Sequence, residues 1–358
     1  MLNMGKKTEK TAPRTYDYCG SCTFYLFAII VTLICQAVAG VLSAALSAKF
    51  DGIAENGDFN TAFMIFIQAV NLAFIAYYTK RNNYKFDFAV IGGKNNNGKA
   101  LWAAMAVVPV IGAALLLVAM YLPTVWYGFF TQYALKLDPE LGSINLTTTS
   151  ATVMIVIASV FLAPMCEETI YRGVLLHGLK QKKSTAKAIL LSALAFMLMH
   201  MSPVQVVFQF SLGVVGAYMT LKSERLFPSI LMHATANALA LVMELTPFGG
   251  VLGDCVAWLT QNITAAVFIT LGLFVCGGGA LYALIRFGFG LAKRTDKTRS
   301  EIGENYDENV TTGDENTPEA VKSRMISAER DRNGTYMYYI GVGLCAIVFI
   351  FNLAVSVL

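Results

Sequence analysis

Three charged side chains interrupt an apolar run near the middle of the chain. Residues 164–173 read PMCEETIYRG and close a hydrophobic stretch that begins near Thr152. A charge at the centre of a bilayer costs about 2.5–3.5 kcal/mol on insertion scales, so these side chains need partners or a function. Glu168 and Arg172 are four residues apart, and we expect them to form an ion pair along one face of a helix. That pair leaves Glu167 without a structural explanation.

The histidines place further polar groups at a similar depth. His200 ends the segment FMLMH, and His233 opens HATAN, in which Asn237 follows one helical turn later. Counted from the nearest cytoplasmic basic residue at about 1.5 Å per helical residue, Glu167 and His200 each lie roughly 20 Å deep. On the same scale His233 and Asn237 lie roughly 12 and 18 Å deep. We therefore expect all four to meet in one cavity, and His177, beside lysines, to be solvated.

This set of residue types can hydrolyse a peptide bond. A buried glutamate with a histidine can activate a water molecule, which predicts that role for Glu167 and His200. A histidine and an amide can donate hydrogen bonds to an oxyanion, which predicts that role for His233 and Asn237. Glu167, His200 and His233 could instead ligate a divalent metal such as zinc. The sequence leaves the metal-free and metal-dependent mechanisms equally open.

Other side chains on the same helix are expected to support the site. Glu168 and Arg172 are predicted to orient the helix through their ion pair. Tyr171 shares a face with Glu167, and we expect its ring to pack, with donation to that carboxylate as the alternative.

The composition is that of a polytopic membrane protein. Of the 358 residues, 56% are hydrophobic and 14% are charged. Apolar runs of 18 or more residues recur, which indicates transmembrane helices rather than buried helices of a soluble protein. We predict an all-α membrane bundle of about nine helices. Their approximate bounds are 24–46, 61–79, 101–122, 152–179, 186–201, 203–221, 227–245, 258–285 and 336–358.

The basic residues indicate the orientation of the bundle. With a cytoplasmic N-terminus, 24 of the 27 lysines and arginines fall in cytoplasmic segments. Only Lys49 and Lys136 fall outside, and Arg172 lies within the membrane. Because basic residues near span ends set insertion, this bias predicts a cytoplasmic N-terminus. We expect an integral, multi-pass protein, in the plasma membrane if the source is bacterial.

Segments of different composition divide the chain. The stretch 123–151 is expected to be an outer connection whose start, PTVWYGFFTQY, lies in the membrane interface, and PFGGVLGD is expected to form a turn. Cys19 and Cys22 form a CGSC pair without the second pair that a structural zinc site needs, so we expect ordinary thiols. The predicted units are a cytosolic tail (1–22), a polytopic domain (23–293) with a protease-like core (150–245), a disordered cytosolic linker (294–335) and a last membrane helix (336–358).

The three motifs EETIYRG, FMLMH and HATAN resemble those of the CAAX-processing and bacteriocin-processing (CPBP, or abortive-infection) intramembrane endopeptidases. The resemblance covers residues 150–245. It implies an all-helical membrane core whose cleft holds the catalytic groups, with Glu167 acting as base beside His200. It also implies that His233 and Asn237 stabilise the oxyanion. Both a metalloprotease mechanism and a metal-free glutamate mechanism have been described for this family.

Two other classes of function compete with proteolysis. A non-catalytic bacteriocin-immunity or scaffold protein could use the same fold, and buried carboxylates and histidines also serve proton- or ion-coupled transporters. For the leading hypothesis we expect a membrane-associated peptide or protein as substrate. The lipid bilayer is the other expected partner, nucleic acid is not expected, and the oligomeric state is left open.

Overall fold

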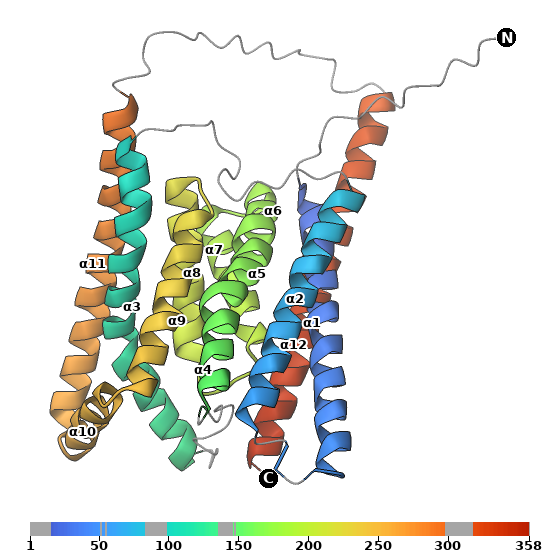
Figure 1. Ribbon diagram of the computed structural model, residues 1–358. Coiled ribbons are helices and arrows are strands. Elements are labelled where there is room, and N and C mark those ends of the chain that lie inside the picture. The colour runs from blue at the N-terminus through green and yellow to red at the C-terminus, as the bar shows by residue number, and fades with distance from the viewer. Residues whose placement is uncertain are drawn as a thin grey trace.

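The protein is a bundle of helices in its computed structural model, which describes residues 16–50, 52–53, 56–82, 99–134, 146, 148–297 and 318–357. Every regular element of these ranges is helical (Figure 1). Within the described ranges, eight helices are long and apolar enough to cross a membrane. One predicted span corresponds to α7 (Thr185–Met199), which has only 15 residues. The predicted all-α membrane bundle is confirmed.

A central group of helices contains the predicted core. One continuous rod rises through α4, η1, α5, η2 and α6, and the short α7, then α8 and α9, pack beside it (Figure 1). The bounds are α4 Thr149–Ile155, η1 Val156–Leu162, α5 Ala163–Glu168, η2 Thr169–Leu175, α6 Leu176–Lys182, α8 Val206–Ser223 and α9 Phe227–Leu245.

Outer helices flank this group on two sides (Figure 1). On one side α3 packs against α11, α9 and α8, and on the other α1 packs against α12, α2 and α6. Gly178 of α6 permits the approach of α1, because a Cβ atom there would overlap the side chain of Ser21. The outer helices are α1 Tyr18–Ser47, α2 Gly57–Arg81, α3 Lys99–Ala134, α10 Phe248–Gln261, α11 Ile263–Lys297 and α12 Pro318–Val357.

The central rod is wound as a π-helix on both sides of the paired glutamates. Segments η1 and η2 flank α5, which carries Glu167 and Glu168. π-Helical turns are rare and frequently occur at functional sites. The wider turn leaves backbone carbonyls without their usual donors, so that side chains can bind them. One carbonyl in each segment accepts from a side chain: Ser159 O in η1 from Asn237, and Arg172 O in η2 from His177.

The predicted linker at 294–335 is wrong at both ends. Helix α11 continues to Lys297, and α12 begins at Pro318, whereas residues 298–317 lie outside the described residues. The polar half of α12 is held by ion pairs with the start of α1 and the end of α6. Arg330 lies 2.7 Å from Asp17, and Lys182 lies 2.7 Å from Asp331. Tertiary contacts thus stabilise a helix whose composition alone resembles disorder.

Three further boundaries differ from the prediction. Helix α1 begins at Tyr18, where Asp17 caps it by accepting a hydrogen bond from Gly20 N at 2.7 Å, so the CGSC pair is helical rather than in a tail. Helix α3 continues to Ala134, where an interfacial segment was expected from 123, and residues 135–145 lie outside the described residues. The PFGGVLGD stretch begins helix α10 rather than forming a turn.

Candidate active site

Glu167 lies at the meeting point of two imidazole rings from different helices. Its Oε2 atom is 3.8 Å from His200 Nε2 and 3.9 Å from His233 Nε2. The residue is only 8% exposed, and this oxygen has no hydrogen-bond partner among the described residues. The three side chains come from α5, the end of α7 and α9. The structure therefore brings the acid and the two imidazoles together, with both rings within 4 Å of Glu167 Oε2.

The hydrogen bonds of the two rings leave both Nε2 atoms free to face Glu167. His200 Nδ1 lies 3.0 Å from the carbonyl oxygen of Phe196, and since a carbonyl can only accept, Nδ1 carries the proton. The Nε2 atom of a neutral His200 is then an acceptor. His233 is held in the same way, with Nδ1 2.9 Å from Glu168 Oε1. When both rings are neutral, three acceptor atoms therefore face one point, where a hydrogen-bond donor such as water can bind.

Glu168 supports His233 rather than facing the same point as Glu167. Its Oε1 accepts from Arg172 Nη1 at 2.7 Å, which confirms the predicted ion pair, and its Oε2 accepts from the hydroxyl of Ser229. The carboxylate therefore has three partners, and both members of the ion pair are fully buried. Carboxylates that bind the second ring nitrogen of a functional histidine set its orientation and tautomer.

Arg172 is enclosed by the protein on every side. Its guanidinium lies 4.2 Å from the centre of the Phe196 ring, and Nη2 donates to the carbonyl of Leu212 at 3.3 Å. Gly216 faces it, and a Cβ atom there would lie 3.3 Å from Arg172 Nε. A buried cation needs this degree of pairing, since the loss of one partner of a buried ion pair typically costs about 3–5 kcal/mol.

Asn237 binds the backbone of the central rod. Its Nδ2 donates to the carbonyl oxygen of Ser159 at 2.7 Å. Within η1 the Ala163 N–H bonds the Ala158 carbonyl, five residues back, so the next donor in that pattern would be the N–H of residue 164. That residue is Pro164, which has no N–H. The amide of Asn237 supplies the missing donor and joins α9 to η1.

A cleft with a volume of about 220 Å³ opens beside Glu167 and His200. Since a water molecule takes about 30 Å³ in the liquid, the cleft has room for several. Its opposite wall comes from α1 and α2. Neither Asn237 nor His233 lines it. The lining residues are Thr32, Gln36, Met64, Ile67, Gln68, Asn71, Cys166, Glu167, Ile170, Met199 and His200.

Two hydrogen bonds hold the opposite wall of the cleft in place, one between α5 and α2 and one between α1 and α2. Cys166 donates through its thiol to the Gln68 carbonyl at 3.3 Å, and Thr32 donates to Asn71 Oδ1 at 3.1 Å. The side-chain oxygen of Gln68 is buried and has no described partner. This wall thus presents amide groups to whatever enters the cleft.

The structure also settles two smaller predictions. Tyr171 packs, as expected: its ring meets that of Phe196 edge to face at 5.3 Å, and its hydroxyl has no hydrogen-bond partner among the described residues. His177 is not simply solvated, because it is half-buried and its Nδ1 lies 2.8 Å from the carbonyl of Arg172. The π-helical turn of η2 leaves that carbonyl accessible to a side chain.

The residues present do not form a metal site in this arrangement. No group of three His, Cys, Asp or Glu side chains in the described ranges is placed to hold a metal ion. Ligands of a tetrahedral zinc lie about 3.3 Å apart, given bonds of about 2.0–2.1 Å. The distances from Glu167 Oε2 to the Nε2 atoms of His200 and His233 are longer, 3.8 and 3.9 Å. The mechanism proposed below uses no metal.

Sequence reasoning missed several residues of the site, although each left a signal. Ser229 lies four residues before His233 and therefore on the same helical face. Gln68 and Asn71 are three residues apart in the apolar segment FMIFIQAVNLAF, and Thr32 with Gln36 shows similar spacing in VTLICQ. Polar pairs at helical spacing inside an apolar helix indicate a shared face directed into the protein.

Comparison with known proteins shows a similarity in the central helices. Residues 149–239 match the family model described as type II CAAX prenyl endopeptidase Rce1-like. This part of the chain is therefore similar to that family. The matched range contains the whole of EETIYRG, FMLMH and HATAN, so the resemblance carried by these motifs is shown. Six of the described helices lie wholly outside the range that matches: α1, α2, α3, α10, α11 and α12.

One curated relative supports the same assignment. The chain is 25% identical over 130 residues to the "Putative membrane peptidase YdiL" of Bacillus subtilis (strain 168). The alignment covers 36% of this chain and spans half the length of that relative. No solved structure matches the chain. Together with the eight long apolar helices of the described ranges, the match to the Rce1-like model shows an integral, multi-pass membrane protein with resemblance to membrane proteases.

Proposed function

We propose that this protein is an intramembrane endopeptidase that hydrolyses a peptide bond in a membrane-associated peptide or protein. The observation that carries the proposal is the buried Glu167 Oε2, which has no described partner and faces the Nε2 atoms of His200 and His233. These distances are too long for direct hydrogen bonds and short enough for one bridging water molecule. The Rce1-like match of the surrounding helices supports the same class of reaction.

Glu167 is the general base in this mechanism, and His200 orients the water. The water donates one hydrogen to Glu167 and the other to His200 Nε2, so that an oxygen lone pair points at the scissile carbonyl carbon. As the new C–O bond forms, the proton passes to Glu167 and the carbonyl oxygen becomes an oxyanion. When the C–N bond breaks, Glu167 returns this proton to the leaving amine. Atoms and charge therefore balance without a further reactant.

His233 is the proposed donor to the oxyanion. As an imidazolium it donates from Nδ1 to Glu168 and keeps an N–H on Nε2 for the developing negative charge. Asn237 was predicted to share this role, but one amide hydrogen already binds the Ser159 carbonyl. We assign Asn237 to positioning: it holds α9 against η1 and thereby sets the place of His233.

The far wall of the cleft is proposed to bind the substrate backbone. A peptide that enters the membrane loses the hydrogen bonds that its amides make with water, and each unsatisfied group is costly there. Gln36 and Gln68 line the cleft opposite Glu167 and can offer both donors and acceptors to an extended chain. Substrate and catalytic carboxylate would then face each other across the cleft.

Comparison of membrane peptides from two strains tests the proposal. One strain would produce the wild-type protein and the other Glu167→Gln, and mass spectrometry would identify new peptide termini in the membrane fraction. We expect termini that occur with the wild type and are absent with Glu167→Gln. Glu244→Gln is a matched control, since Glu244 is an exposed glutamate near the end of α9. Identical termini in all strains would favour the non-catalytic immunity or scaffold role instead.

A further inference from the structure

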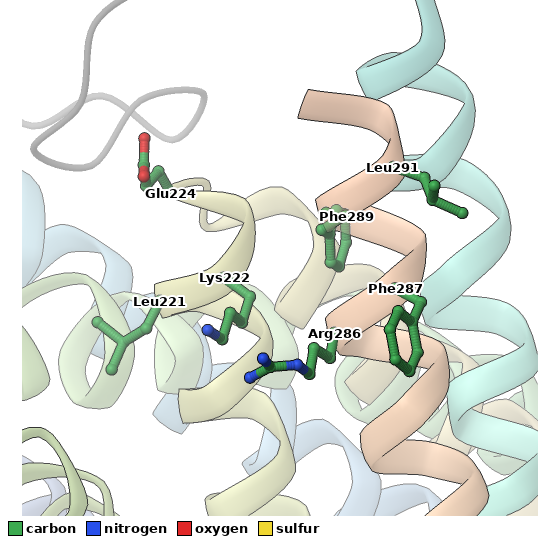
Figure 2. A pocket seen from close by; sticks show the side chains of 8 residues that line it. Leu221, Lys222, Glu224, Arg286, Phe287, Phe289 and Leu291 are labelled. Atoms are coloured by element: carbon green, nitrogen blue, oxygen red, sulfur yellow. The ribbon is translucent and has the colours of Figure 1, made fainter. Parts of the chain in front are cut away.

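A second cavity lies between α8 and α11, away from the cleft. Its volume is about 430 Å³, and no residue that lines it also lines the cleft beside Glu167. Figure 2 shows it between the last turn of α8 and the neighbouring part of α11. The lining residues are Leu221, Lys222, Glu224, Arg286, Phe287, Phe289, Gly290 and Leu291.

Two tyrosines hold two cations at this cavity. The Tyr218 and Tyr282 rings stack with their centres 5.5 Å apart, one from each helix. The Lys222 ammonium lies 5.6 Å from the centre of the Tyr218 ring, and Arg286 Nη1 donates to the Tyr282 hydroxyl at 3.3 Å. Contacts of this kind restrict where the two long side chains can reach. Both positive groups therefore face the same space.

No acid neutralises these cations within the part of the chain that the structure describes. No described carboxylate oxygen lies within 4.0 Å of Lys222 Nζ or of the Arg286 guanidinium. Glu224 also lines the cavity, but Figure 2 shows its carboxylate directed away from both cations. Two like charges held side by side create a positive potential that attracts an anion.

The surroundings match an anion that carries an apolar tail. Phe287 and Leu291 line the cavity and are 59% and 63% exposed, and Phe289 is buried at its side. The charge bias places Lys222 at the cytoplasmic end of α8 and Arg286 in the cytoplasmic half of α11. Anionic lipids gather in the cytoplasmic leaflet, where basic pockets between membrane helices bind their headgroups.

We propose that Lys222 and Arg286 form a binding site for a phosphate group between α8 and α11. A lipid headgroup and a free phosphate present the same chemistry to these side chains, since each offers several acceptor oxygens to two cations. This proposal does not depend on peptidase activity, because the site shares no residue with the cleft.

The test compares two sources of phosphate with the full-length protein. In one arm, detergent-solubilised protein is titrated with phosphatidylglycerol, or with phosphatidylcholine as the zwitterionic reference, and bound lipid is counted by native mass spectrometry. In the other arm, inorganic phosphate is added and thermal unfolding is followed. The variant Lys222→Gln/Arg286→Gln removes both charges. Gly290→Leu places an apolar side chain in the cavity without a change in charge. The substitution has room, because no atom lies within 4 Å of a Cβ at that position.

Helix α2 offers a matched control for the loss of two charges. Arg81 Nη1 donates to the Tyr77 hydroxyl at 3.1 Å, the same arrangement as in Arg286 and Tyr282, and Lys80 precedes it. Neither basic residue lines the cavity. The variant Lys80→Gln/Arg81→Gln therefore changes net charge equally without touching the proposed site.

We expect Lys222→Gln/Arg286→Gln to bind phosphatidylglycerol about tenfold more weakly than the wild type, because two charge-assisted contacts are lost. Gly290→Leu should also weaken binding, and Lys80→Gln/Arg81→Gln should not. If the wild type binds phosphatidylglycerol and inorganic phosphate does not change its thermal unfolding, the ligand is a lipid headgroup. If inorganic phosphate raises the melting temperature of the wild type but not of Lys222→Gln/Arg286→Gln, the ligand is a free phosphate. Equal behaviour of the two charge variants in both arms would overturn the proposal.

Discussion

The Nδ1 atom of His233 lies 2.9 Å from Glu168 Oε1, so the second glutamate of the pair holds an imidazole rather than sharing the role of the first. Two adjacent carboxylates of one helix thereby serve different purposes. Glu168 is anchored by Arg172 and Ser229, whereas Glu167 Oε2 has no described partner. The unpartnered carboxylate is the one that faces the candidate water site.

Replacement of Glu167 should abolish hydrolysis without unfolding the protein. For Glu167→Gln we expect kcat to fall by about 10²–10⁴-fold, the usual contribution of a general base. The melting temperature should change little, because the buried oxygen has no partner to lose. Turnover of a membrane peptide cleaved by the wild type, measured in proteoliposomes, checks the rate. Activity within twofold of the wild type would contradict the assignment of the base.

Removal of either charge of the buried ion pair should destabilise the protein strongly. Glu168→Gln and Arg172→Met each leave the other charge buried, for which we expect a loss of about 3–5 kcal/mol. The double variant should lose much less than the sum of the two, because no charge remains unpaired. Thermal unfolding in detergent measures these differences. Additive losses would show that the two side chains do not stabilise each other.

Ser229 should act through His233 and not on the substrate. Ser229→Ala removes the hydrogen bond that the Ser229 hydroxyl donates to Glu168. We expect kcat to fall by about tenfold, the lower end of the usual effect when a group that supports a functional histidine is lost. Ser229→Thr keeps the hydroxyl and should recover most of the rate. KM should stay unchanged in both variants. A rise in KM with constant kcat would place Ser229 at the substrate instead.

Asn237 and Pro164 should be energetically coupled through the Ser159 carbonyl. Asn237→Ala leaves this carbonyl without its donor, at a cost of about 1–3 kcal/mol. In a Pro164→Ala background the new backbone N–H can bond the same carbonyl, so the loss on Asn237→Ala should be smaller. A double-mutant cycle of unfolding free energies measures the coupling. Equal losses in both backgrounds would rule it out.

Metal chelation should leave the activity intact. The distances of 3.8 and 3.9 Å around Glu167 Oε2 are longer than a tetrahedral zinc site requires, and the proposed mechanism uses only this chain's side chains and water. We expect unchanged cleavage after treatment with EDTA followed by dialysis. Cleavage lost in this way and restored by zinc would establish the metal-dependent alternative.

The sequence was sufficient for features that depend on a single helix. The spacing of Glu168 and Arg172 predicted their ion pair, because residues four apart share a face of any α-helix. The apolar runs predicted the membrane bundle in the same way, since their length matches the bilayer. The depth estimate brought Glu167, His200 and His233 to one level because rise per residue is constant within a helix.

The partners across helices were decided by the tertiary structure. Depth does not give the rotation of a helix about its axis, so nothing in the sequence assigned His233 to Glu168. His233 and Asn237 share a helical face, which predicted a common role. In the structure the Asn237 amide instead donates to the Ser159 carbonyl, which has no backbone donor because Pro164 lacks an N–H. The wall formed by α1 and α2 likewise depends on contacts between residues far apart in the chain, which periodicity along one helix cannot specify.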